Sequence, residues 1–440
     1  MWRRPFIKLS PPQLLIVVFI FFGFLGTLLL KLPVSTTESI TLVDALFTAT
    51  SAMTVTGLAV VDTGSAYTLF GQIVILFLIQ VGGIGIMTFA VLIFIMLGKK
   101  ISFQERLILQ QALNQTSVGG IILLVRRIII FSFLIEGIAV LLLSYRWIPE
   151  YGWWDGFYYS VFHSISAFNN AGFSIWPDSL IQYVGDPVVN IVVSFLFIIG
   201  GIGFTVLTDL WYTKEFRRLT LHTKIMLFGT LGINILAMFV FFVLEYFNPS
   251  TLGNFTLIEK IWASYFQAVT TRTAGFNTID IAAMETASIM WTLLLMFIGA
   301  GSTSTGGGIK LTTFIIIILA VNTFIKGKRE IVIFNRSIHQ SYVIKALAIS
   351  TISILFIFFS LFILTITEQA EFLLLLFDVI SAFGTVGLSM GITGDLTDIG
   401  KCVIVFIMLL GKLGPLTLAY SLAKPKPSKV RYPNEDLLTG

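Results

Sequence analysis

Charged side chains are scarce in this sequence, making up 12% of its 440 residues. A soluble domain carries about twice that fraction, so the composition argues against an ordinary soluble fold. Hydrophobic residues make up 56% of the chain, and its mean hydropathy is +0.94. Several apolar runs approach the roughly 20 residues that cross about 30 Å of hydrocarbon. The sequence therefore predicts a polytopic α-helical membrane protein.

Motifs typical of enzymes are also missing. The single cysteine, Cys402, excludes a disulfide framework. The apolar runs hold no paired carboxylates, catalytic histidine or metal-ligand motif, and the chain has no nucleotide-binding motif. We therefore expect a protein that is not an enzyme and has no cofactor of its own. The pI near 9.1 does not predict a nucleic-acid partner, because the basic residues cluster in loops between apolar runs.

Four segments of the chain share one pattern: an aromatic residue, a glycine ten positions later, and then Phe or Leu. They are Phe47–Leu58, Phe162–Phe173, Tyr265–Phe276 and Phe377–Leu388. Glycine near aromatic residues also marks ordinary close packing of membrane helices, and a single copy would fit either interpretation. Four copies at near-regular spacing indicate an internal repeat.

Each repeat is predicted to contain a long apolar helix, a short semi-polar segment that ends at the glycine, and a second long apolar helix. The long helices are expected at Leu14–Leu32, Phe70–Leu97, Ile128–Tyr145, Val188–Tyr212, Ile225–Tyr246, Ala287–Ile325, Ala346–Thr367 and Cys402–Leu422. The short segments are Leu42–Gly57, Trp153–Gly172, Leu257–Gly275 and Phe372–Gly387. They are too short to span a membrane and suit re-entrant half-helices.

The predicted fold class follows from this layout. It is an all-α polytopic membrane protein with eight transmembrane helices, arranged as four membrane–pore–membrane repeats around a single pseudo-four-fold pore. The repeats occupy residues 1–98, 99–213, 214–330 and 331–440, and the last one includes a cytoplasmic C-terminus.

Basic residues mark the orientation of this layout. Most of the 28 Lys and Arg residues fall at the two termini and in the loops that join one repeat to the next. Most of the 23 Asp and Glu residues fall on the opposite side. Because cytoplasmic loops carry the excess of Lys and Arg, both termini are predicted in the cytoplasm. The short segments then enter the membrane from outside.

The last four residues of each short segment are here called the glycine segments: 54–57, 169–172, 272–275 and 384–387. Glycine permits backbone conformations that turn carbonyl oxygens toward an axis, and the preceding half-helix directs its negative C-terminal end to the same point. A ring of four copies would replace the hydration shell of a potassium ion. The predicted selectivity-filter residues are Thr54, Val55, Thr56, Gly57, Asn170, Ala171, Gly172, Thr273, Ala274, Gly275, Thr385, Val386 and Gly387.

The glycine segments also carry a resemblance to a known family. The sequence resembles the Ktr/Trk family of potassium transporters, most closely the membrane (ion-translocating) subunit of the Ktr type. The matching stretches are Ser10-Pro-Pro-Gln, Ala45-Leu-Phe-Thr-Ala, Ser166–Phe173, Gln267–Phe276 and Ser381–Leu388. The resemblance implies one pore per protomer, a homodimer in the lipid of a bacterial plasma membrane, and a cytosolic nucleotide-binding regulatory ring as partner. It maps the family's filter glycines to Gly57, Gly172, Gly275 and Gly387.

A glycine-rich stretch interrupts the third repeat. The apolar run Ala287–Ile325 would be about 58 Å long as one helix, roughly twice the hydrocarbon thickness, and its consecutive glycines disfavour helix. We predict a loop over residues 299–310 that gates the pore, as the corresponding loop does in the family. A helix kink that serves packing is the alternative. The predicted gate residues are Gly299, Gly301, Ser302, Thr303, Ser304, Thr305, Gly306, Gly307, Gly308, Lys310 and Lys412.

Among the charged residues inside the predicted helices or glycine segments, three carry an expectation: Lys412, Glu136 and Arg272. Lys412 occupies a position where the family typically has arginine, and a charge at that depth usually faces a cavity. We expect Lys412 to act as a barrier in the pore, with pairing to Glu136 as the structural alternative. Arg272 is expected to point behind the filter and brace it.

The predicted function is channel-like potassium uptake, driven by the membrane potential and gated under control of the regulatory subunit. The potential supplies about 2.3 kcal/mol per 100 mV for a monovalent cation. Potassium is the expected substrate, and sodium dependence is left open because the sequence shows no separate sodium site. The alternative is a secondary transporter of a small solute built on parallel repeats.

Overall fold

The computed structural model describes residues 11–85 and 121–414, which are built mostly from α-helices. The first group of helices contains α1 (Pro11–Leu30), α2 (Leu42–Thr54), α3 (Thr63–Ala66) and α4 (Leu69–Ile84). The second contains α7 (Ile121–Tyr151), α8 (Trp153–Phe168), α9 (Pro187–Ile202) and α10 (Phe204–Tyr212). The third contains α11 (Leu221–Glu245), α12 (Leu257–Thr270), α13 (Thr286–Phe297) and α14 (Leu311–Ile325). The fourth contains α15 (Gln340–Thr367), α16 (Phe372–Gly384) and α17 (Asp398–Leu413).

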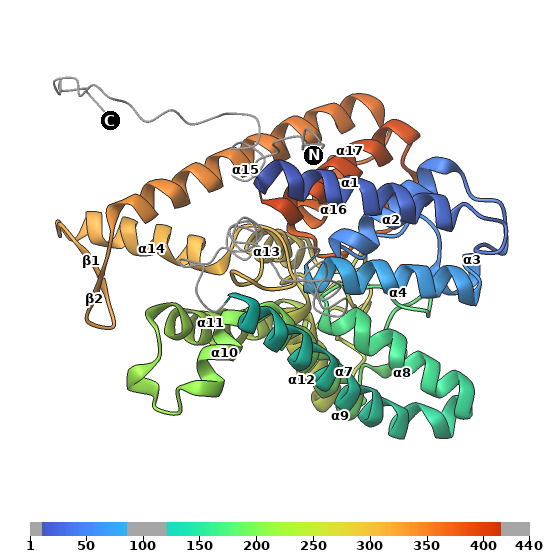
Figure 1. The fold of residues 1–440 in the computed structure, drawn as a ribbon, viewed down its shortest axis with the longest axis horizontal. Helices are drawn as coiled ribbons and strands as arrows, with labels where there is room; N and C mark the ends of the chain where they lie inside the picture. Colours follow the sequence, from blue (N-terminus) through green and yellow to red (C-terminus); the bar gives the residue numbers. More distant parts are fainter. Residues whose placement is uncertain (1–10, 86–120, 415–440) are drawn as a thin grey trace, which may run out of the picture.

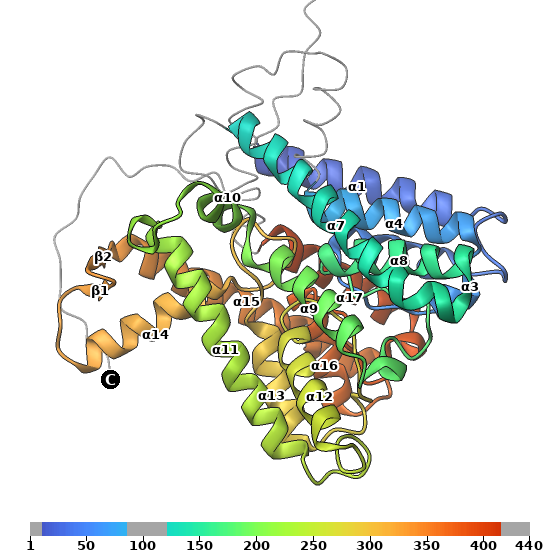
Figure 2. The same ribbon diagram turned by 90° about the horizontal axis from the view of Figure 1, so that it is seen from below.

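The four groups surround the centre of the molecule in chain order. In Figures 1 and 2 the first group is blue, the second teal to green, the third lime to gold, and the fourth orange to red. Neighbouring groups touch through α4 and α8, α9 and α12, α13 and α16, and finally α17 and α2. The last of these contacts joins the fourth group to the first and closes the circle.

A β-hairpin is the first of two departures from the predicted helices. A hairpin of β1 (Ile331–Ile333) and β2 (Arg336–Ile338) joins α14 to α15, and the sequence had not indicated any strand. α14 and α15 pack together and extend away from the centre, with the hairpin at their far end (Figure 1). The prediction of a helical membrane-type protein is otherwise confirmed.

The aromatic–glycine pattern has a packing role between groups. In each copy, the first aromatic residue and the residue after the glycine pack into a hydrophobic cluster with side chains of the preceding group. For the first copy, the preceding group in the circle is the fourth. These pairs are Phe47 and Leu58, Phe162 and Phe173, Tyr265 and Phe276, and Phe377 and Leu388. Lipid tails are as apolar as these side chains, so close packing rather than the hydrophobic effect holds such contacts together in a membrane.

In every group, the second long helix bends, breaks or reaches its described end next to a glycine. α9 and α10 meet at Gly203 (φ 106°) with a bend of 93°, so the prediction of one continuous helix over Val188–Tyr212 is wrong. The predicted interruption within Ala287–Ile325 is confirmed, because α13 and α14 are separate helices. α4 and α17 end just before Gly85 (φ 90°) and Gly414 (φ 83°).

The number of membrane spans remains partly a prediction. Three of the described helices are long and apolar enough to cross a membrane: Val125–Tyr151, Leu221–Glu245 and Gln340–Thr367. The bent pair α9 and α10 counts as a fourth if taken as one span. The predicted helix ends at Leu97 and Leu422 lie outside the described residues. So do the basic residues within residues 1–10, 86–120 and 415–440. Eight full spans and the cytoplasmic termini are therefore expectations.

Three glycines allow the second helices to approach the short helices closely. A Cβ atom at Gly82 would lie 1.8 Å from the carbonyl oxygen of Met53, which is in α2. A Cβ atom at Gly200 would lie 2.0 Å from the Phe168 carbonyl oxygen, and one at Gly411 would lie 2.0 Å from the Phe383 carbonyl oxygen. Any side chain at these positions would push the second helix away from the C-terminal end of the short helix that it supports.

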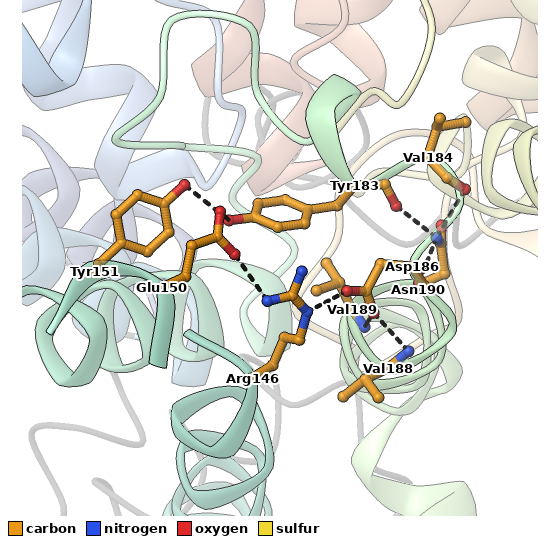
Figure 3. Close-up of polar contacts among 9 residues, drawn as sticks. All are labelled: Arg146, Glu150, Tyr151, Tyr183, Val184, Asp186, Val188, Val189 and Asn190. Carbon is orange, nitrogen blue, oxygen red and sulfur yellow. Dashed lines mark hydrogen bonds and ion pairs between the residues drawn. The ribbon is translucent and has the colours of Figure 1, made fainter. Parts of the chain in front are cut away.

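Polar side chains tie the end of α7 to the start of α9. The Arg146 guanidinium is hydrogen-bonded to Glu150, one turn along α7, and to Asp186 (Figure 3). Asp186 also accepts hydrogen bonds from the first amides of α9, at Val188 and Val189, as a helix N-cap does. This cluster holds together the two helices between which α8 enters the structure.

Candidate functional site

The four filter glycines predicted from the sequence meet in cyclic order. If each glycine carried a Cβ atom, that atom would strike the carbonyl oxygen of the residue before the next glycine. The distances are 2.4 Å (Gly57 to Ala171), 3.0 Å (Gly172 to Ala274), 2.3 Å (Gly275 to Val386) and 2.2 Å (Gly387 to Thr56). In real proteins, a Cβ atom essentially never lies closer than 3.0 Å to a heavy atom of another residue. Each glycine therefore leaves room for the carbonyl of its neighbour.

The backbones of all four glycine segments have positive φ at the same two positions. The glycines have φ values of 90°, 68°, 78° and 92°. The residues two positions earlier also have positive φ: Val55 (52°), Asn170 (56°), Thr273 (69°) and Thr385 (48°). Such values are uncommon for residues with a side chain. Positive φ at every second residue prevents the alternation of carbonyl directions found in a strand, so successive carbonyls can face one axis.

Hydroxyl groups behind the segments hold this conformation in two different ways. Ser51 and Ser381 accept hydrogen bonds from the backbone N–H of Gly57 and Gly387, both at 3.1 Å. The Ser166 and Thr270 hydroxyls instead donate to carbonyl oxygens just past the glycine, at Phe173 (2.7 Å) and Phe276 (2.5 Å). The first and fourth segments thus form one kind and the second and third another, so the ring is only approximately four-fold.

Arg272 points away from the ring, as the sequence predicted. Its side chain is 8% exposed, and its Nη1 donates to Asn234 Oδ1 of α11 at 3.2 Å. The guanidinium therefore braces the third segment against the first long helix of its own group.

The glycine-rich loop, residues 299–310, is closed at its base. Ile298 and Ile309 form a parallel bridge. The Gly299 N–H donates to the Ile309 carbonyl at 2.8 Å, and the Leu311 N–H donates to the Ala300 carbonyl at 3.2 Å. The two limbs of the loop are therefore held together where α13 ends and α14 begins.

The tip of this loop lies against three of the four glycine segments. The Thr305 hydroxyl donates to Asn170 Oδ1 at 2.6 Å, and the Gly307 N–H donates to Thr385 Oγ1 at 2.8 Å. A Cβ atom at Gly306 would lie 2.2 Å from Thr273 Oγ1. These three partners are the residues with positive φ, so the loop touches the strained positions of the ring.

The loop also completes the broken helix of the second group. A helix end leaves its last carbonyls without partners. Loop amides supply them, because Gly301 N–H donates to Gly201 O at 2.8 Å and Thr305 N–H donates to Gly200 O at 3.2 Å. The Phe204 N–H, at the start of α10, donates to Thr303 O at 3.0 Å. The bend at Gly203 and the position of the loop thus depend on each other.

Two lysines hold the loop through its carbonyl groups. The Lys412 ammonium donates to the Thr305 carbonyl, and the Lys310 ammonium donates to the Gly306 carbonyl at 2.8 Å. The alternative pairing of Lys412 with Glu136 is wrong, because Glu136 is bonded to Gln80 and Asn169. Sequence alone could not show which faces of these distant helices meet.

A further contact that the sequence did not predict joins the first and fourth groups. Lys401 of α17 forms an ion pair of 2.8 Å with Asp44 of α2, and both side chains are nearly buried. Burial opposes ionisation of Asp44, but hydrogen bonds from Lys401 and Thr41 outweigh it and hold the pKa of Asp44 below its ordinary value. The pair helps to close the circle of helix groups.

Comparison with known proteins identifies the family. The model of the family described as "TrkH: Cation transport protein" matches residues 9–432. The chain belongs to the TrkH family. The Ktr system potassium uptake protein B of Bacillus subtilis is 57% identical over 99% of this chain and 98% of its own length. The potassium/sodium uptake protein NtpJ of Enterococcus hirae is 38% identical over 98% of each chain.

A solved structure agrees with the fold of this TrkH-family chain. The crystal structure of the potassium transporter TrkH from Vibrio parahaemolyticus matches with a TM-score of 0.75 at 22% identity, over 96% of this chain and 87% of that one. The members of the family found here are ion transport proteins, not enzymes. The comparisons do not favour the alternative of a small-solute transporter on parallel repeats. Within residues 11–85 and 121–414, no group of His, Cys, Asp and Glu could hold a metal ion.

Proposed function

We propose that this chain is the membrane subunit of a potassium uptake system, with one pore formed by its four glycine segments. The observation that carries the proposal is the cyclic contact of Gly57, Gly172, Gly275 and Gly387, each with positive φ. Carbonyl oxygens facing one axis replace the water molecules that a potassium ion loses. The names of the Bacillus and Enterococcus relatives support potassium as the substrate and leave sodium as a second ion.

The glycine-rich loop is the proposed gate of this pore. It touches three glycine segments from one side, and Lys310 and Lys412 bring two ammonium groups to its carbonyls. Positive charge on the ion path opposes the entry of a cation. Opening then requires that the contacts of Thr305 and Gly307 with the ring be broken.

The proposed assembly follows the Ktr name of the relatives. It is a homodimer in a bacterial cell membrane, with both termini in the cytoplasm and a cytosolic nucleotide-binding regulatory subunit bound there. The short helices α2, α8, α12 and α16 would enter from outside. Their C-terminal ends, which carry partial negative charge, would then face the ion at the ring.

Growth of a bacterium that lacks its own potassium uptake tests the proposal. We expect the chain, expressed with a Ktr-type regulatory subunit, to restore growth at limiting potassium, with an empty vector as control. Growth should also be measured across a range of sodium concentrations, which shows whether uptake needs sodium. Lack of rescue, despite confirmed expression of both subunits in the membrane, would contradict a role in potassium uptake.

A further inference from the structure

A carboxylate lies buried in the middle of α7, next to the second glycine segment. Glu136 is 4% exposed. Its two oxygens accept hydrogen bonds from Gln80 Nε2 of α4, both at 3.1 Å, and Oε1 also accepts one from Asn169 Nδ2 at 3.2 Å. Among the described residues no lysine, arginine or histidine forms an ion pair with it. An acidic side chain at such depth is costly and usually functional.

Asn169 connects this carboxylate to the ring. It is the first residue of the second glycine segment and is fully buried. Its Nδ2 also donates to Gln80 Oε1 at 2.8 Å and to the Ile165 carbonyl at 2.9 Å. Gly83 leaves room for the amide, because a Cβ atom there would lie 2.0 Å from Asn169 Oδ1. Side chains from α4 and α7 thus fix one amide at the C-terminal end of α8.

The next residue along the chain makes contacts with the ring and the loop. Asn170 has a φ of 56°, donates to Thr273 Oγ1 of the third segment at 3.3 Å, and accepts the hydrogen bond from the Thr305 hydroxyl. A shift of the Asn169 amide would therefore move a strained residue that touches both a neighbouring segment and the loop. The third segment has a similar arrangement, in which Arg272, at the matching position, is held by Asn234 of α11.

We propose that Glu136 is a positioning residue for ion selection, acting through Gln80 and Asn169 on the second glycine segment. This inference rests on the proposed potassium function. The carboxylate supplies acceptors to both amides, and no other side chain of α7 makes a described hydrogen bond with Asn169. Without it, the buried amide of Asn169 and the half-buried amide of Gln80 each lose a partner, and leaving such groups unsatisfied favours rearrangement. The segment should then lose its spacing, and the ring its preference for potassium over sodium.

Uptake of rubidium-86 into proteoliposomes, in competition with potassium or sodium, tests this role. We expect Glu136→Ala to lower the preference for potassium over sodium by about tenfold. Glu136→Gln should have a smaller effect, since its amide keeps one acceptor. Ser132→Ala is the matched control: Ser132 lies one turn earlier in α7 and is buried, and among the described residues its hydroxyl bonds only to the Ile128 carbonyl. That control should keep the wild-type preference.

Further variants keep the test decisive if Glu136→Ala does not fold. Gln80→Met removes the other side of the brace at similar volume, and should lower the preference in the same direction. The double variant Glu136→Gln with Asn169→Ala should be no less selective than Asn169→Ala alone, because both act on one amide. An unchanged preference in Glu136→Gln and Gln80→Met would overturn the inference. If the wild-type protein itself failed to prefer potassium, the proposed function would fail instead.

Discussion

We expect Gly387→Ser to lower the preference for potassium over sodium by at least about tenfold, or ~1.4 kcal/mol. Gly387 has a φ of 92°, and a Cβ atom there would lie 2.2 Å from the Thr56 carbonyl oxygen. The added atom must displace that carbonyl or the segment that carries Gly387. Either movement widens the ring, and a wider ring replaces the water shell of potassium less completely. Competition of sodium with potassium for rubidium-86 uptake measures the change.

Gly391→Ser is a closely matched control for this substitution. Gly391 lies four residues further along, has a φ of 95°, and its Cβ atom would meet nothing within 4 Å. The control therefore adds the same side chain at the same kind of backbone position without touching the ring. Its preference for potassium should equal that of the wild type. Equal loss of preference in both variants would mean that backbone strain, not the ring, explains the effect.

Deletion of Ser302–Gly307 is expected to raise the potassium flux through purified protein by about tenfold in the absence of the regulatory subunit. The deletion removes the contacts of Thr305 with Asn170 and of Gly307 with Thr385. It also frees Lys412 from the loop. The base should survive, because residues 298–300 pair with 309–311 outside the deleted stretch. Flux is measured as potassium uptake into proteoliposomes at equal amounts of protein.

Ion preference serves as the internal control for the deletion. The four glycines of the proposed filter are untouched, so deletion of a gate should raise the flux and keep the preference for potassium. A higher flux with lost preference would mean that the loop supports the ring rather than closing it. An unaltered flux would favour the alternative that this loop serves packing and does not gate the pore.

Much of the organisation of the chain could be predicted, because the relevant signals are local. The recurring glycine, ten positions after an aromatic residue, marked the ends of α2, α8, α12 and α16 to within five residues. The glycines from Gly299 to Gly308 predicted the break between α13 and α14, because glycine disfavours helix. Both signals lie within a few residues of the features that they predict.

Features that depend on distant contacts could not be predicted in this way. The bend at Gly203 is stabilised by the loop amides of Gly301 and Thr305, whereas Gly200-Gly-Ile-Gly203 alone also fits a continuous helix. The partners of Glu136 lie on α4 and α8, and nothing in the order of residues shows which face of α7 meets them. Lys401 and Asp44 come from opposite ends of the chain. Each case needs the packed structure.

The most direct test of the central claim is to locate the ion. Crystals grown with thallium(I), an anomalous scatterer that resembles potassium in size and charge, would show where a permeant cation binds. We predict an anomalous peak on the axis between Gly57, Gly172, Gly275 and Gly387, weakened when excess potassium competes with thallium. The absence of such a peak in transport-active protein, or strong peaks only at sites away from these glycines, would contradict the account.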